Sequence, residues 1–137
     1  MAMYGSSITL DQAKQAAAAA IAVARKNNWA MAVAIVDTAG LLVYFEKMDD
    51  TQTGSVVVAQ AKARSAALFK RSTKVFQDRL ASGGDGLLVL RLEGAVPVEG
   101  GIPLVIDGKI VGAIGVSGGT SPQDGQCAQP AVDLLMG

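Results

Sequence analysis

GGIPLVIDGKIVGAIGVSGGTSPQD, residues 100–124, is the stretch of this chain that decides its fold. Two apolar runs, 103–106 and 110–116, meet at Asp107-Gly108, and a glycine pair bounds the hairpin on each side. Asp-Gly readily takes the two left-handed conformations that a tight type I′ turn requires. The stretch therefore predicts a β-hairpin. Strands joined by short turns indicate an antiparallel sheet, whose faces helices must cover.

Apolar periodicity and turn signals place the other elements around this hairpin. A capping-box pattern at Thr9–Gln12 starts a helix that ends near Asn27-Asn28. Further strands are expected at 31–36, 41–48 and 87–90, and further helices at 56–69, 73–80 and 123–136. The expected order is α-β-β-α-α-β-β-β-α, with about five strands in the sheet. This is an α/β fold of the α+β type.

Composition sets the broad class of the protein. The 137 residues fit one domain, 1–137, which can bury about two-thirds of the surface of the unfolded chain. The 12 basic and 12 acidic residues cancel without blocks of like charge, so no nucleic-acid partner is expected. No apolar run reaches the roughly 18 residues that suggest a membrane span. The N-terminus lacks the basic segment of a secretory signal, so we expect a cytoplasmic protein.

The chain has no histidine and a single cysteine, Cys127. It therefore lacks the usual general base at neutral pH, the Ser-His and Cys-His catalytic pairs, and metal sites built on histidine or several cysteines. Proton transfer in an enzyme would fall to Glu99, Asp124 or Lys62. These absences favour a binding protein over an enzyme. Cys127 is expected to be a small residue on the last helix.

The densest basic cluster, Lys62, Lys70, Arg71 and Lys74, spans the second helix and its exit. Lys62 lies off the apolar helical face that includes Val57, so the cluster fits a solvent-exposed face. The alternative is recognition of carboxylates, which Arg71 could bind in bidentate fashion.

Glycine-rich loops and an isolated carboxylate supply the remaining candidates. Gly118-Gly119 precedes a helix start at Ser121-Pro122 and could offer backbone N–H groups to an anion, or could simply turn the chain. The spacing matches neither a P-loop nor a dinucleotide fingerprint. Glu99, directly before Gly100-Gly101, is the isolated carboxylate best suited to a site role.

On one face of the last expected strand, the side chains become small toward its end. Ala113, Gly115 and Ser117 follow one another on that face, because alternate residues of a strand point the same way. A helix, a flat ligand or a second subunit could approach the backbone closely there. The residues alone leave all three open.

Three segments together resemble a known family. They are AVAIVDTAG at 32–40, AKARSAA at 61–67 with FKRST at 69–73, and the hairpin stretch from 100 to 119 with Gln123-Asp124. In order and spacing these segments resemble the GlcG/HbpS-like haem-binding proteins, also found as the C-terminal domain of PduO-type cobalamin adenosyltransferases. The resemblance implies a profilin-like α/β sandwich with an antiparallel sheet, and homo-oligomers from dimers to octamers.

We expect a small-molecule ligand, either a small anion or, as the resemblance implies, haem or another tetrapyrrole, between the sheet edge and the second helix. Because the chain has no histidine, haem would bind without histidine ligation. Met48, Tyr44, Cys127 and Lys62 stay open as alternative iron ligands. The alternative function is that of a non-catalytic, oligomeric accessory protein of a glycolate, glycerol or propanediol utilisation pathway. The residues expected around the ligand are Lys62, Arg71, Glu99, Gly100, Gly101, Gly118, Gly119 and Asp124.

Overall fold

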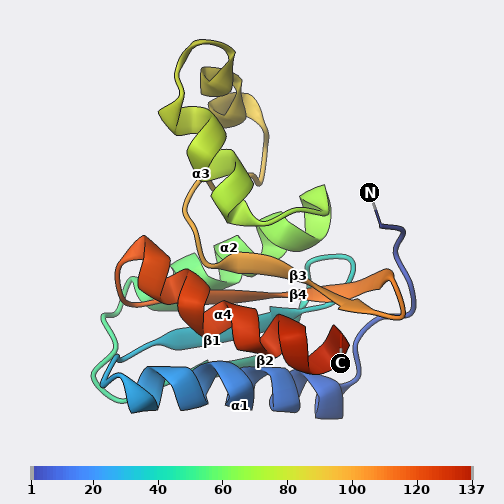
Figure 1. The fold of residues 1–137 in the computed structure, drawn as a ribbon, viewed down its shortest axis with the longest axis vertical. Coiled ribbons are helices and arrows are strands. Elements are labelled where there is room, and N and C mark those ends of the chain that lie inside the picture. The colour runs from blue at the N-terminus through green and yellow to red at the C-terminus, as the bar shows by residue number, and fades with distance from the viewer. Residues whose placement is uncertain (1, 137) are drawn as a thin grey trace.

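The computed structural model describes residues 2–136 and forms one sheet with helices on both of its faces (Figure 1). The elements in chain order are α1 (Leu10–Lys26), β1 (Ala32–Val36), β2 (Leu42–Lys47), α2 (Ser55–Phe69), α3 (Thr73–Ala81), the 3₁₀ helix η1 (Gly84–Arg91), β3 (Gly101–Ile106), β4 (Lys109–Ser117) and α4 (Ser121–Met136). This α+β order confirms the expected architecture, apart from one strand.

Within residues 2–136 the sheet has four antiparallel strands in the order β2-β1-β4-β3, rather than about five. The expected strand at 87–90 is wrong, because this segment belongs to η1. Its buried residues, Gly86 and Val89, are three apart, which is the period of a 3₁₀ helix. A short apolar run cannot be assigned to strand or helix by periodicity alone, and here contact with α3 decides for the helix.

The hairpin of β3 and β4 forms as predicted. Asp107 and Gly108 have φ values of 51° and 75°, the left-handed pair that a type I′ turn requires. The capping box of α1 is also confirmed. The Gln12 N–H donates to the Thr9 hydroxyl, and the Thr9 N–H donates to the Gln12 side-chain oxygen. Local sequence rules are therefore obeyed at both sites.

Helices α1 and α4 cover one face of the sheet, and α2 covers the other (Figure 1). Alanines dominate both helix–sheet contacts and allow close packing. Gly115 on β4 meets α2 so closely that a Cβ there would overlap the Ala59 carbonyl oxygen. The small-residue face of β4 is thus filled by a helix, one of the three occupants left open by the residues.

Helix α3 and η1 project from the body as an arm, which we define as residues 73–98 (Figure 1). Phe76 at its base is buried and packs edge-on against Phe69 at the end of α2, with ring centroids 5.4 Å apart. The chain returns from the arm through Glu99 and Gly100 into β3. None of the helices described is both long enough and apolar enough to traverse a bilayer.

Candidate functional site

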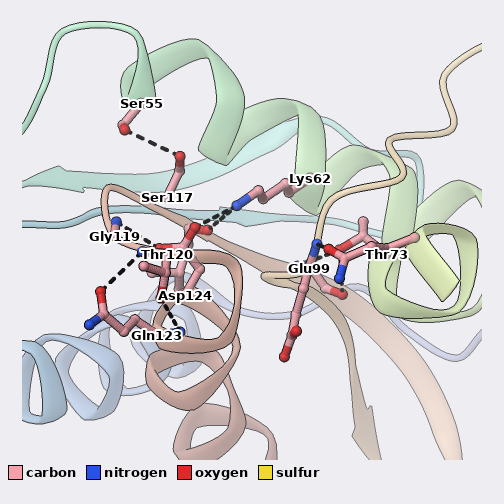
Figure 2. A network of polar contacts seen from close by, with 12 residues as sticks. Ser55, Lys62, Thr73, Glu99, Ser117, Gly119, Thr120, Gln123 and Asp124 are labelled. Carbon is pink, nitrogen blue, oxygen red and sulfur yellow. Dashed lines mark hydrogen bonds and ion pairs between the residues drawn. The ribbon is translucent and has the colours of Figure 1, made fainter. Parts of the chain in front are cut away.

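A buried ion pair joins α2 to α4 behind the start of β3 (Figure 2). The Lys62 ammonium donates to Asp124 Oδ2 at 2.8 Å and to the Val116 carbonyl oxygen at 3.0 Å. The two side chains are 1% and 4% exposed. The prediction that Lys62 lies on a solvated face is therefore wrong, because its charge is already paired inside the protein. That Lys62 contacts a ligand stays a prediction.

The error in placing Lys62 has a physical cause. The buried stripe of α2 includes Ala59, Lys62, Ala63 and Ala66, whereas Val57, which was expected to face inward, is 71% exposed. A buried lysine is tolerated only when a partner compensates its charge. That partner, Asp124, lies 62 residues further along the chain, so helical periodicity gave no sign of it.

The second oxygen of Asp124 holds the loop that follows β4. Asp124 Oδ1 accepts the Gly119 N–H at 2.9 Å, and Thr120 and Gln123 cap the start of α4 by mutual hydrogen bonds. The Gly119 N–H is therefore committed to an internal contact rather than offered to a ligand anion. Gly118 lies against the backbone of Ala30, where a Cβ would not fit.

Burial changes the pKa of Asp124, the acidic residue of this ion pair. Desolvation raises the pKa of the Asp124 carboxyl, while the Lys62 ammonium and the backbone N–H groups at Gly119 and Gly118 oppose the rise. Both side chains are buried, and the pair links α2, β4 and α4.

Gly100 and Gly101 lie directly on this junction. A Cβ at Gly100 would lie 2.9 Å from Lys62 Nζ, and one at Gly101 would overlap the Lys62 carbonyl oxygen. The Gly101 N–H donates to the Thr73 hydroxyl at 2.9 Å, which ties β3 to the first residue of α3. Close approach of the helices to the backbone therefore requires glycine at both positions.

The Glu99 side chain points away from Lys62 and lies over α4 (Figure 2). Its carboxylate rests on Gly125, where a Cβ would overlap Glu99 Oε2. The Glu99 N–H donates to the Gln77 side-chain oxygen at 2.8 Å, which orients the residue. Within residues 2–136 the Glu99 carboxylate has no hydrogen-bond partner, so it is available to a ligand.

This carboxylate borders a pocket of about 290 Å³ between the start of α3, the start of β3 and α4. The polar groups around the pocket combine an acid, an ammonium, a hydroxyl and an amide. Lys74 is half-exposed and paired with Asp78 at 2.7 Å, and this hydrogen bond raises the pKa of the Lys74 ammonium. The lining residues are Ser72, Lys74, Glu99, Gly100, Gly101, Ile102, Gly125 and Gln129.

The predicted site residues thus separate into three groups. Glu99, Gly100 and Gly101 line the pocket, whereas Lys62, Gly119 and Asp124 form the buried network beside it. Gly118 adjoins that network, as described above.

Arg71 belongs neither to the pocket lining nor to the buried network. Its Nε donates to the Phe69 carbonyl oxygen, and its guanidinium stands 5.7 Å from the centroid of the Phe76 ring.

Sequence reasoning missed five of the eight residues that line the pocket. Ser72, Lys74, Ile102, Gly125 and Gln129 were not assigned to the site, although Lys74 was noted in the basic cluster. One signal was available, since Gly125 falls inside an expected helix, where glycine costs about 1 kcal/mol relative to alanine. A helical glycine indicates a close approach by another group, here the Glu99 carboxylate.

Each of the four residues considered as iron ligands is engaged in a contact within the protein. Cys127 is fully buried, and burial, with a smaller effect of Asp124, raises the pKa of its thiol to about 11. Lys62 is ion-paired, the Tyr44 hydroxyl donates to Glu46 Oε1, and Met48 packs against the core. Residues 2–136 hold no cluster of three or more His, Cys, Asp or Glu side chains that could bind a metal.

Comparison with known proteins identifies the family. The family described as "Haem degrading protein HbpS-like" matches residues 8–133, so this chain belongs to the HbpS-like family. Protein GlcG of Escherichia coli K12 is 39% identical over 94 residues, which cover 69% of each chain.

Two solved structures share the fold. A double mutant of Streptomyces reticuli HbpS has a TM-score of 0.87 at 28% identity, covering 98% of this chain and 91% of that one. The structure described as "PduOC:Heme Complex" has a TM-score of 0.82 at 29% identity, covering 93% and 94%.

Proposed function

We propose that this protein binds a tetrapyrrole, with haem as the first candidate, without a strong axial bond from its own side chains. The observation that carries the proposal is the likeness over nearly the whole chain to a protein solved with haem. Membership of a family described as haem-degrading supports it. The pathway in which such a protein acts stays a prediction.

The Glu99 pocket is the proposed contact point. At about 290 Å³ it lies at the lower end of the volumes usual for small-molecule sites, so the edge of a macrocycle enters it and the rest lies outside. Gly100 and Gly101 let a flat ligand approach the backbone, and Ile102 supplies an apolar contact. Lys74, whose ion pair with Asp78 is exposed to solvent, replaces Lys62 and Arg71 as the cation that pairs with a ligand carboxylate, which would compete with Asp78 for it.

Glu99 restricts how the ligand enters. Its unpartnered carboxylate repels a second anion, so the ligand's carboxylates must lie toward Lys74 and Ser72. Because none of the four candidate side chains lines the Glu99 pocket, affinity would come from apolar burial and carboxylate pairing. Bound haem would supply its own redox chemistry at the iron.

The test is a parallel titration of the protein with haemin and with iron-free protoporphyrin IX, followed by absorbance and by quenching of Trp29 fluorescence. We expect both to bind, with dissociation constants within about threefold of one another. Binding of haemin alone, with the spectrum of a strongly ligated iron, would overturn the proposal. So would the failure of both compounds to bind.

A matched pair of lysine variants locates the contact. Lys74→Met should weaken binding of both compounds by about tenfold, because it removes the carboxylate partner. Lys14→Met, an equally conservative change at an exposed position on α1, should leave both affinities unchanged. Equal effects of the two variants would show that binding does not use the Glu99 pocket.

A further inference from the structure

Two opposite charges border the Glu99 pocket without forming an ion pair. The Glu99 carboxylate and the Lys74 ammonium both line it, and within residues 2–136 the cation of Lys74 pairs with Asp78 instead. The hydrogen bond to Asp78 is the main cause of the raised pKa of the Lys74 ammonium, and the negative charge of Glu99 adds a smaller effect. The two pocket charges therefore interact across the cavity. A cavity between opposite charges suits a ligand that carries the same two charges in reverse.

The Glu99 carboxylate is held in position for such a ligand. Its side chain points away from Lys62 (Figure 2). The Glu99 N–H donates to the Gln77 side-chain oxygen at 2.8 Å, and the carboxylate rests on Gly125, which has no Cβ to displace it. An acceptor that is fixed before binding loses little freedom when the ligand arrives.

The rest of the lining suits a small ligand with an apolar part. Ile102 supplies an apolar contact, and Gly100 and Gly101 let the ligand approach the backbone. Ser72 and Gln129 add a hydroxyl and an amide. The cavity of about 290 Å³ lies at the lower end of the volumes usual for small-molecule sites, so the whole of a small ligand fits inside it.

Ligands with a single kind of charge fit less well. Glu99 repels a simple anion, and Lys74 repels a simple cation. A divalent metal ion takes several oxygen ligands, whereas Glu99 is the one carboxylate among the lining residues that the structure describes. A neutral molecule would leave both charges desolvated without a counter-charge, which is costly.

We propose that the Glu99 pocket binds a small aliphatic amino acid, whose ammonium donates to the Glu99 carboxylate and whose carboxylate pairs with Lys74. The side chain of the amino acid packs on Ile102. This inference goes beyond tetrapyrrole binding: it shares the pocket with the proposed function and does not require haem to bind.

The first test titrates the ¹⁵N-labelled full chain with L-valine and follows the backbone amide signals by NMR. We expect saturable shifts of the Gly100, Gly101 and Gly125 signals. Two matched compounds each lack one charge, since 3-methylbutanoate has no ammonium and 2-methylpropylamine has no carboxylate. Each should bind at least about tenfold more weakly than valine, because a charge-assisted hydrogen bond is lost.

A matched pair of glutamate variants then locates the ammonium of the ligand. Glu99→Gln keeps the shape of the side chain and removes its charge, so it should weaken valine binding by about tenfold. The same variant should not weaken haemin binding, because it removes a repulsive anion. Glu93→Gln, an exposed position of the arm outside the pocket, should leave valine binding unchanged. Far-UV circular dichroism checks that both variants are folded.

Three results would overturn the proposal. They are the absence of valine binding, equal affinities for valine and 3-methylbutanoate, and equal effects of the two glutamine variants on valine binding. Haemin binding without valine binding would contradict this proposal and leave the proposed function intact. Valine binding by a chain that binds neither haemin nor protoporphyrin IX would support this proposal and overturn the proposed function.

Discussion

The body and the arm of this molecule place their side chains in opposite ways. In the body, the lysine of α2 is 1% exposed, whereas in the arm Leu90 is 64% exposed. The lysine is buried because Asp124 and the Val116 carbonyl oxygen compensate its charge. The leucine is exposed because no helix or strand within residues 2–136 covers it. Burial is therefore decided by the partner available at each position and not by the side chain alone.

The strongest test of this comparison removes Lys62, the partner of the buried Asp124 in the body of the molecule. Lys62→Met should lower the free energy of unfolding by about 3–5 kcal/mol, because it leaves the Asp124 carboxylate buried and unpaired. Lys62→Met with Asp124→Leu should recover much of that loss, since an apolar pair needs no charge compensation. Urea unfolding of the two single variants and the double variant gives the coupling energy. Additive losses would show that the pair does not act as a unit.

The second test compares leucines of the two regions. Leu104→Ala on β3 should cost about 2–5 kcal/mol of unfolding free energy, because Leu104 is fully buried. Leu90→Ala should cost less than about 0.5 kcal/mol in a dilute sample. Equal costs for the two leucines would contradict the contrast between the buried body and the exposed arm.

The third test uses the thiol of Cys127, which is buried in the body of the molecule. The pKa of Cys127 is raised from 9.0 to about 11 in the folded protein, so above pH 9 the unfolded chain loses this proton first. The folded state then binds more protons than the unfolded state, and stability falls as pH rises from 9 to 11. The loss should be about 1 kcal/mol at pH 10. Unfolding curves for Cys127→Ala should lack this component, and equal pH dependence in both proteins would contradict it.

The smallest expected effect concerns Gly125. Alanine at this helical position should gain about 0.5–1 kcal/mol when Glu99 is also replaced by alanine, because the clash is gone and helix propensity rises. Gly125→Ala alone should gain less, since it displaces the Glu99 carboxylate. Thermal unfolding of the two single variants and the double variant measures the difference. The same gain with and without Glu99 would show that the carboxylate does not rest on this glycine.

Much of the fold could be predicted from the sequence because its signals are local. The Asp107-Gly108 turn and the Thr9–Gln12 cap each depend on neighbouring residues, and both form as expected. The segment 87–90 was wrong, because a short apolar run suits a strand or a helix equally and contact with α3 decides between them.

The site was predictable only in part. Glu99, Gly100 and Gly101 were named from their isolation and their glycines, and they line the pocket. The lining residues on α4, Gly125 and Gln129, lie well over twenty positions further along the chain and reach the pocket only through tertiary packing. Residue type alone does not reveal that Lys62 forms a buried ion pair with Asp124.

The sequence by itself determined the hairpin, the helix starts and the family, because turns, caps and motif spacing depend on residues close together in the chain. The tertiary structure alone decided where the charges went. It paired the α2 lysine with Asp124, laid Glu99 on Gly125, and left the leucines of η1 exposed. Each of these outcomes depends on contacts between residues far apart in sequence, which periodicity and composition do not encode.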